Sequence, residues 1–354
     1  MQNVIAKINL KTIVENAKIF QRRTGGKVCA VVKADAYGHG AERVAFALAD
    51  TVDFFAVATE TEGLKIKTAT CGKEILVLTP PACEQETESL VRSGLSVSIG
   101  SLQDARSVVN CVKKTGERAF VHLKLNTGMN RYGIEEKDLD TVCRFLKGRG
   151  QVCVQGVYSH LYGGKKSTLE KQRIAFERGA GLCRTYFPNV LRHLSATLGA
   201  TLSEEFYFDA VRIGLGLYGY LPNGVPACVK RELPLQKAMT VYARAQSERA
   251  YISGGAGYGE VKKRVERKLR KKGVSILRVG YADGFLRDGK KKSVSELQAN
   301  DLCMDACPVV GRREKGEYFA VVTDAEQTAK RTGTTAYEVL CACTKRAEFE
   351  YEYE

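Results

Sequence analysis

The sequence predicts an α/β protein, an N-terminal (β/α)8 TIM-type barrel followed by a mostly β C-terminal domain. The first two thirds of the 354 residues alternate short apolar runs with amphipathic stretches, as parallel strands and crossover helices do. Eight such pairs fill about 220 residues, which is the size and strand count of a barrel. Helical periodicity then fades near residue 226. We therefore expect domains at 1–225 and 226–354.

Eight apolar runs are the expected barrel strands. They are 28–32, 54–58, 75–79, 95–99, 119–125, 152–160, 190–194 and 209–215. Amphipathic stretches between them, among them 84–93, 101–114 and 169–185, are expected to be helices. A doubly wound open sheet is the alternative, but the Gly-rich dinucleotide turn of that fold is missing after the first strand.

The C-terminal part is expected to be a smaller β domain. Pro222, Pro226 and Pro234 mark the transition. Short apolar runs joined by Gly-rich connections then follow, as in β-rich domains. The expected strands are 239–247, 274–280, 305–310, 318–322 and 337–342.

Composition indicates an ordinary globular protein with an excess of positive charge. Apolar residues make up 44% and charged residues 27%, which excludes a disordered chain. No apolar run reaches the ~18–20 residues that span a bilayer, and the N-terminus lacks a signal-peptide pattern. Twelve Cys residues without a CxxC pair indicate reduced thiols. We therefore expect a cytoplasmic protein with no membrane partner.

The net charge of +15 raises the possibility of nucleic-acid binding. The stretch 261–272 holds eight Lys/Arg and one Glu, so 8 − 1 gives +7, but it has no aromatic residue. A nucleic-acid site needs a basic stripe with interleaved aromatics or a known binding motif. A solvated helix face or loop is the favoured interpretation, and no nucleic-acid partner is expected.

Candidate reactive side chains cluster at the ends of the expected strands. In a barrel, catalytic groups lie at the carboxyl ends of the strands. Such positions are held by Lys33, Lys124, His160 and Ser195, while Arg212 lies within the eighth strand. The four His residues show no HxH or HExxH spacing, so no metal site is expected. The other two strand histidines, 122 and 193, are expected to pack inside the strands.

Lys33 is the most specific candidate, because it lies at the end of a strand that is expected to be buried. Desolvation lowers a lysine pKa and frees the amine to form a Schiff base, although a lysine snorkelling out of a strand end fits equally well. The glycines within 36–40 and Gly214 would allow an anion to approach backbone N–H groups. Most glycines of this kind, however, only mark turns. Tyr258, between two glycines, is either an acid/base or an ordinary loop residue.

Six motifs follow one another in the chain: AVVKADAYGHG, NTGMNRYG, VRIGLGLYG, GYGE, GYADGFLR and CMD. Together they resemble the alanine racemase family across essentially the whole chain. The resemblance implies a pyridoxal-phosphate enzyme that interconverts L- and D-alanine and supplies D-alanine for peptidoglycan. It also implies a small amino-acid substrate and a homodimer with shared active sites.

The resemblance implies a role for each matching residue. Lys33 would bind pyridoxal phosphate covalently and act as one acid/base, and Tyr258 of the partner subunit would act as the opposing one. Lys124 matches a lysine that is carbamylated in many members. The implied cofactor contacts are Tyr37, His160, Ser195, Arg212, Gly214 and Leu215. The implied substrate-binding residues are Arg131, Tyr281, Met304 and Asp305.

Three departures from the family pattern keep alternatives open. Asn126 replaces the usual Asp, the segment around Ser195 is shorter, and Lys345 falls where a pocket tyrosine is expected. A serine or broader-specificity racemase is therefore the second hypothesis. A non-catalytic pyridoxal-phosphate carrier would lack the β domain. A barrel-type decarboxylase would need a C-terminal cysteine motif, which the sequence does not contain.

Overall fold

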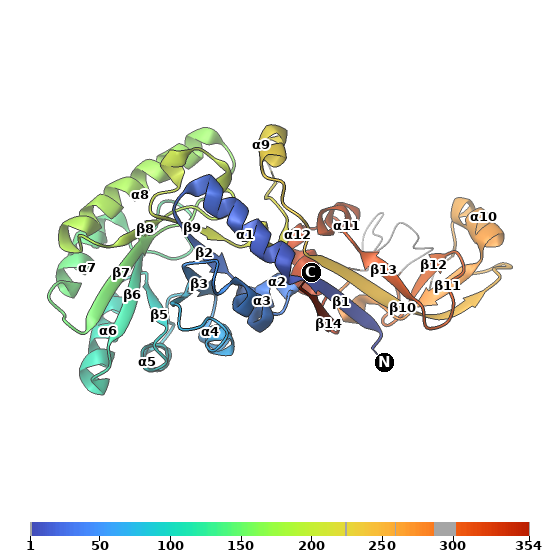
Figure 1. Cartoon of the computed structure of the whole chain (residues 1–354), viewed down its shortest axis with the longest axis horizontal. Helices are drawn as coiled ribbons and strands as arrows, with labels where there is room; N and C mark the ends of the chain where they lie inside the picture. Colours follow the sequence, from blue (N-terminus) through green and yellow to red (C-terminus); the bar gives the residue numbers. More distant parts are fainter. Residues whose placement is uncertain (1, 224, 259, 287–301, 354) are drawn as a thin grey trace. The chain divides into compact units, whose positions relative to one another are not determined.

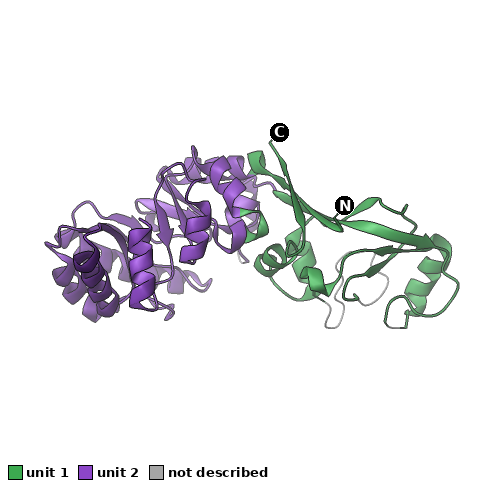
Figure 2. Cartoon of the chain, turned by 90° about the horizontal axis from the view of Figure 1, so that it is seen from below, with its two compact units in different colours: residues 1–12, 37–40, 237–354 green, residues 13–36, 41–236 purple. Residues whose placement is uncertain are grey.

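A computed structural model describes residues 2–223, 225–258, 260–286 and 302–353. The chain forms two compact units (Figures 1 and 2): unit 1 consists of 1–12, 37–40 and 237–354, and unit 2 of 13–36 and 41–236. The units differ from the expected domains in two places. Residues 1–12 and 37–40 belong to unit 1 with the C-terminal part, and residues 226–236 belong to unit 2 with the barrel. Gly259, Arg287 and Asp301, which the predicted motifs include, lie outside the described ranges.

Unit 2 is a barrel of eight parallel strands, in the order β8-β7-β6-β5-β4-β3-β2-β9, which confirms the predicted fold class. Backbone hydrogen bonds join its two edge strands, from Asp209 N to Arg192 O (3.0 Å) and from Arg212 N to Ser195 O (2.8 Å). All eight predicted strands are present. They are β2 Lys27–Val31, β3 Phe54–Val57, β4 Ile75–Val77, β5 Ser96–Ile99, β6 Ala119–Lys124, β7 Val152–Tyr158, β8 Leu191–His193 and β9 Ala210–Ile213.

Two helices of the barrel begin at side-chain caps. Thr59 and Glu62 form a capping box at the start of α4, and Ser101 caps α6, which Gly116 ends in the left-handed conformation. Helices α3 and α5 to α8 bury apolar residues on one side, as amphipathic helices that cover a barrel do. The helices are α1 Leu10–Thr24, α2 Lys33–Gly38, α3 Ala41–Leu48, α4 Glu60–Ile66, α5 Glu84–Arg92, α6 Leu102–Thr115, α7 Glu136–Leu146, α8 Lys166–Tyr186 and α9 Ala227–Glu232. None of the helices in the described ranges is long and apolar enough to cross a membrane.

Unit 1 is built on a six-stranded sheet, so the predicted mostly β C-terminal part is confirmed. Its order is β12-β11-β10-β1-β14, with β13 also paired to β10. The N-terminal β1 runs antiparallel to β10 and parallel to β14, so both chain ends contribute to this sheet. The strands are β1 Val4–Asn9, β10 Met239–Arg249, β11 Val274–Leu277, β12 Cys307–Val310, β13 Tyr318–Val322 and β14 Glu348–Glu352.

The strand predicted at 337–342 is wrong, because this segment is helix α12, Ala336–Ala342. A capping box between Thr335 and Glu338 starts the helix, and this local pattern outweighs the short apolar run. A second helix, α11 Ala325–Thr332, precedes it and is capped by Asp324. Unit 1 therefore contains more helix than the sequence indicated.

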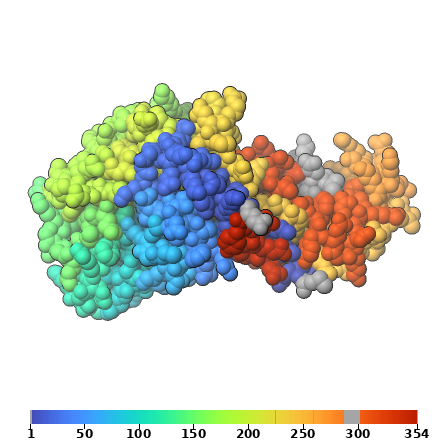
Figure 3. Space-filling view, in the orientation of Figure 1, coloured from blue at the N-terminus to red at the C-terminus, as the bar shows by residue number. Residues whose placement is uncertain are grey.

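The basic stretch forms helix α10, Lys263–Lys272, so of the two structures left open for it, helix or exposed loop, the helix is correct. Its apolar side is used within unit 1, where the fully buried Leu269 packs with Tyr251 and Val274. The Lys and Arg side chains are mostly exposed at the surface of the orange segment in Figure 3. Much of the excess charge is therefore a solvated helix face.

Candidate active site

The predicted strand-end cations of the barrel lie within electrostatic reach of one another. Lys33 lies two residues beyond the end of β2, and Lys124 ends β6. Burial lowers the pKa of Lys124 to about 7, assisted by the positive charges of Arg212, Arg131 and Lys33. Burial and these same cations, together with Lys124, lower the pKa of His160 well below its usual value. The barrel therefore carries a strongly electropositive site.

Arg212 is the most deeply fixed of these cations. Its side chain is buried, and its Nη1 donates to the carbonyl of His193 (2.5 Å) and to the Nδ1 of that ring (3.1 Å). Nη2 donates to the carbonyls of Ser159 (2.6 Å) and Leu194 (3.1 Å). These contacts use four of the five guanidinium N–H groups. The barrel thus holds Arg212 in one orientation.

The fifth donor of Arg212, Nε–H, makes no hydrogen bond with the described residues, nor does any described carboxylate form an ion pair with this guanidinium. A buried cation without an acidic partner is costly unless an anion or acceptor is supplied. A phosphate-bearing cofactor with a ring nitrogen supplies both. The donor set of the barrel therefore fits pyridoxal phosphate.

Tyr158, which the sequence analysis did not single out, lies beneath two of these cations. The Lys124 ammonium is 4.5 Å and the Arg212 guanidinium 5.1 Å from the centre of its ring. Its hydroxyl contacts Ser98 Oγ (2.7 Å) and donates to the carbonyl of Leu78 (3.1 Å). Burial raises the pKa of Tyr158 to about 12, so the phenol stays neutral. The ring face supports the positive charges without carrying charge itself.

Ser195 and Thr197 differ in what their hydroxyls do. Ser195 Oγ is buried and donates to the carbonyl of Phe206 (2.7 Å), which ties the chain after β8 to the segment before β9. Thr197 Oγ1 instead accepts from Gly216 N (3.2 Å), in the turn that contains Gly214 and Leu215. Thr197 thus faces the predicted phosphate turn. The sequence analysis missed it because Ser195 was the expected hydroxyl.

Lys33 opens a left-handed turn. The φ angles of the next four residues, Ala34–Tyr37, lie between 51° and 55°. Each non-glycine residue in this conformation costs about 1–2 kcal/mol. Three hydrogen bonds oppose this cost. Ala34 N donates to Glu62 Oε1 (2.8 Å), while Ala41 N (3.0 Å) and Lys65 Nζ (2.7 Å) both donate to Asp35 Oδ1. Backbone strain of this kind concentrates at functional sites.

The end of this turn packs within unit 1. Tyr37 is buried, and its ring centre lies 6.0 Å from that of Tyr337 at the start of α12. Gly38 has φ +77°, and a side chain there would meet the carbonyl of Leu340 at 2.3 Å. Lys345, at the position where a pocket tyrosine was expected, is exposed beyond the end of α12. Tyr337 therefore lies beside Tyr37. The sequence signal that could have identified Tyr337 was the Tyr-Glu pair that follows the helix cap at Thr335.

The two late motifs adjoin in unit 1. Tyr281 N donates to the carbonyl of Cys303 (3.0 Å), and Ala282 N to that of Met304 (3.0 Å). Gly280 lies so close that a Cβ would meet Met304 O at 2.0 Å. Asp305 forms an ion pair with Arg346 (2.9 Å). The predicted substrate-binding residues Tyr281, Met304 and Asp305 therefore form one cluster.

Tyr258 lies in a loop of the same unit. Gly257 precedes it with φ +80°, and 66% of the Tyr258 surface is exposed. An exposed phenol on a glycine-flanked loop suits a residue that reaches a site outside its own packed environment.

Comparison with known proteins identifies the chain. Residues 8–222 match the family model "Alanine racemase, N-terminal domain", and residues 239–351 match "Alanine racemase, C-terminal domain". The chain belongs to the alanine racemase family. An alanine racemase of Francisella tularensis is 30% identical, over 97% of this chain and 98% of the relative. One of Methanococcus maripaludis is 29% identical, over 96% of each chain.

Solved alanine racemases share the fold. The Corynebacterium glutamicum structure is 26% identical, with a TM-score of 0.83 over 99% of this chain and 100% of the other. The Bartonella henselae alanine racemase, solved with covalently bound pyridoxal phosphate, is 24% identical, with a TM-score of 0.82 over 99% and 100%. The two-unit architecture is thus that of the alanine racemases.

Proposed function

We propose that the protein is an isomerase that interconverts L- and D-alanine with pyridoxal phosphate and supplies D-alanine for peptidoglycan. The observation that carries this proposal is the electropositive barrel site, where Arg212 keeps an unused donor beside Lys33, Lys124 and Arg131. The bound cofactor supplies an electron sink that acidifies the Cα–H bond of an amino acid. All other chemistry belongs to the side chains.

Racemisation requires a proton to leave one face of Cα and another to arrive on the opposite face. Two bases on opposite faces meet this requirement. Lys33 is the base on one face, since it follows a buried strand at the carboxyl end of the barrel. Tyr258 of the partner subunit is the base on the other face. Its exposure supports such a contribution, and the protein is proposed to be a cytoplasmic homodimer with shared active sites.

Arg212 limits the chemistry to proton transfer. A guanidinium does not give up its proton in a protein, so its Nε–H can only donate to the ring nitrogen of the cofactor. A cofactor held by Arg212 would keep its ring nitrogen unprotonated and would supply only a moderate electron sink. A moderate electron sink favours return of the proton to Cα over side reactions such as transamination.

The remaining residues bind and orient. Tyr37, Thr197 and the backbone N–H groups of Gly214 and Leu215 are the proposed phosphate contacts. The substrate carboxylate is bound by Arg131 and by Met304 N–H. Tyr281 and Asp305 line the entrance, and His160, kept neutral, supports the cofactor.

Alanine rather than serine is the proposed substrate. The serine alternative rested partly on Lys345 replacing a pocket tyrosine, and Tyr337 beside Tyr37 provides an aromatic ring instead. The experiment is a chiral chromatographic assay of the purified protein with L-alanine and with L-serine. A higher kcat/KM for alanine supports the proposal, and a higher value for serine overturns it. A non-catalytic carrier is disfavoured by the presence of the β unit.

Thr197→Val and Ser195→Ala should have different effects. Loss of the Thr197 hydroxyl should weaken cofactor binding about 10-fold or more, because a hydrogen bond to a charged group contributes about 1.5–3 kcal/mol. Ser195→Ala should mainly lower the stability of the cofactor-free protein, because the buried Phe206 carbonyl loses its donor. Spectroscopic titration with pyridoxal phosphate and thermal unfolding measure both. A larger loss of affinity in Ser195→Ala would contradict this assignment.

Lys124 should carry a carbamate whose amount rises with pH. Only the neutral amine attacks carbon dioxide, and with a pKa of about 7 this form increases as pH rises through neutrality. The negative carbamate would be stabilised by Arg131 and Arg212. Asn126, in place of the usual Asp, donates to Glu135 Oε1 (2.7 Å), a bond that an aspartate carboxylate does not make. We expect a carbon-13 carbamate signal in labelled bicarbonate that Lys124→Gln removes; an unchanged signal in that variant would disprove the assignment.

A further inference from the structure

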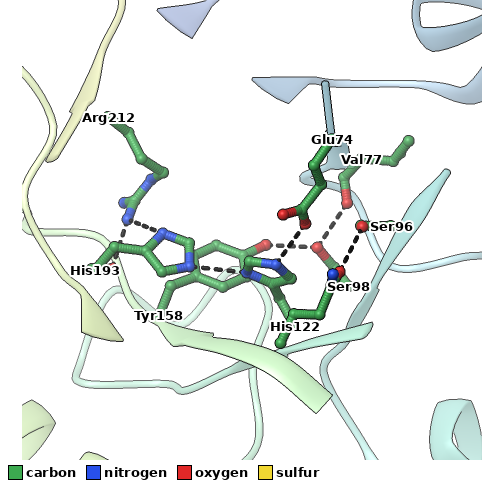
Figure 4. A network of polar contacts seen from close by, with 9 residues as sticks. Glu74, Val77, Ser96, Ser98, His122, Tyr158, His193 and Arg212 are labelled. Atoms are coloured by element: carbon green, nitrogen blue, oxygen red, sulfur yellow. Dashed lines mark hydrogen bonds and ion pairs between the residues drawn. The ribbon is translucent and has the colours of Figure 1, made fainter. Parts of the chain in front are cut away.

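A row of polar side chains, buried except for the partly exposed Glu74, crosses the inside of the barrel (Figure 4). Arg212 Nη1 contacts His193 Nδ1 at 3.1 Å, His193 Nε2 contacts His122 Nδ1 at 2.9 Å, and His122 Nε2 contacts Glu74 Oε1 at 2.7 Å. Both imidazoles are fully buried. Glu74 immediately precedes β4, so it lies at the amino end of that strand, while Arg212 belongs to the electropositive site. The row therefore links two regions of the barrel.

Both ends of the row require the same direction of hydrogen bonding, because Arg212 can only donate and an ionised Glu74 can only accept. A guanidinium only donates, so His193 Nδ1 must accept and the proton of this ring lies on Nε2. That proton is donated to His122 Nδ1, which places the second proton on His122 Nε2. His122 Nε2–H then donates to the Glu74 carboxylate. Each ring is neutral in this arrangement, and every donor meets an acceptor.

The charges around the row agree with this assignment. Burial, followed by Arg212, His122 and Lys124, lowers the pKa of His193 well below its usual value, so this imidazole is neutral. Burial is the largest single influence on Glu74 and raises its pKa, but His122, Ser96 and Lys27 together outweigh burial, so the net pKa is lowered. Ser96 and Lys27 are the other groups that act on the Glu74 carboxylate, and both favour its ionised form.

The barrel leaves space for this row. Gly156 on β7 lies against the ring of His122, and a Cβ at this position would meet His122 Nδ1 at 2.2 Å. The Tyr158 ring stacks on His193 with the ring centres 5.0 Å apart and the planes at 12°. Interior layers of such barrels usually hold bulky branched apolar residues. Here a glycine and an aromatic ring hold two imidazoles in place instead.

We propose that Glu74 is a positioning residue for Arg212, acting through the fixed tautomers of His122 and His193. Because Glu74 accepts from His122, both rings keep their protons on Nε2, and His193 Nδ1 remains an acceptor for Arg212. That acceptor holds the guanidinium with its Nε–H directed away from the row. The role in catalysis rests on the proposed function, but the tautomer pattern is a property of the protein itself.

The first test is nitrogen-15 NMR of the histidine side chains in the cofactor-free protein. The expected result is that His122 and His193 are both neutral and protonated on Nε2 at neutral pH. A cationic ring, or a proton on His193 Nδ1, would overturn the proposal. This measurement does not depend on racemase activity, so it remains decisive even if the proposed function fails.

The second test compares Glu74→Gln with Glu74→Leu. Glutamine keeps an acceptor for His122 Nε2–H and should retain both tautomers, whereas leucine removes it and should alter the His122 tautomer. In the loaded enzyme, Glu74→Leu should lower kcat about 10-fold, with KM little changed and an altered pH profile, because partners that orient a functional group commonly contribute 10–100-fold. Rescue by Glu74→Gln is expected.

Glu117→Gln is the matched control, because Glu117 is exposed and precedes β6 much as Glu74 precedes β4. It should change neither the tautomers nor the pH profile. A purely structural role of Glu74 would lower the unfolding temperature of Glu74→Leu without moving the imidazole signals. That result, or equal activity losses in the two Glu74 variants, would overturn the proposal. If the tautomers are as stated while L-alanine is not racemised, the proposed function alone fails.

Discussion

Replacing Lys33 with alanine is expected to abolish racemisation and retention of the cofactor together. Lys33 is both the proposed covalent anchor and one of the two bases, so no other group replaces it. A single acid/base residue contributes about 10²–10⁴-fold, and loss of the anchor adds to this, so activity should fall by at least about 10³-fold. The chiral assay with L-alanine and the visible absorbance of the bound cofactor measure both effects.

Lys137→Ala is the matched control for Lys33→Ala. Lys137 is exposed on α7 and belongs to neither cluster of the candidate site. Its replacement should leave activity and absorbance unchanged. Borohydride should fix the cofactor to the wild-type protein and not to Lys33→Ala. Cofactor fixed to Lys33→Ala at the wild-type level would contradict the role of Lys33.

Tyr258→Phe is expected to separate cofactor binding from racemisation. The variant removes one hydroxyl from an exposed side chain, so stability and cofactor absorbance should be unchanged. Racemisation should fall about 10²–10⁴-fold, because one face of Cα loses its acid/base. In D2O, NMR should show Cα–H exchange continuing for one enantiomer and lost for the other. Equal exchange of both enantiomers would argue against a two-base arrangement.

A mixture of the two inactive variants tests whether active sites are shared. In a hybrid dimer of Lys33→Ala and Tyr258→Phe, one site has both residues intact if Tyr258 comes from the partner subunit. After random exchange of subunits, about half of the dimers are hybrids with one working site, so about a quarter of wild-type activity should return. A mixture that stays inactive after subunit exchange would exclude the sharing of Tyr258.

Most of the fold was predictable because buried parallel strands are short continuous apolar runs, which the barrel strands show. The same reasoning made the prediction for 337–342 wrong. Its sequence, YEVLCA, is as apolar as a strand, but it follows the helix cap at Thr335 and forms a helix. β1 was not predicted because its partners, β10 and β14, lie more than two hundred residues away. Pairing at that distance leaves little local signal.

The candidate site was predictable where strand position alone decides it. Lys33, Lys124 and Arg212 lie at or near strand ends, and they were expected to lie near one another. The charges of Lys33 and Arg212 do act on Lys124. Side chains that meet across the barrel were not predictable, since His122 and His193 are 71 residues apart and Glu74 looked like an ordinary charged residue. Two histidines within strands indicate packing, and only the fold shows that they touch.

The most direct test of the proposed racemase is the conversion of L-alanine in D2O by the protein loaded with pyridoxal phosphate. The two-base account predicts that D-alanine appears with deuterium at Cα and that the two enantiomers converge to equal amounts. Chiral chromatography with mass spectrometry measures both quantities at once. L-alanine that remains unchanged, or D-alanine that keeps its original hydrogen at Cα, would contradict the account.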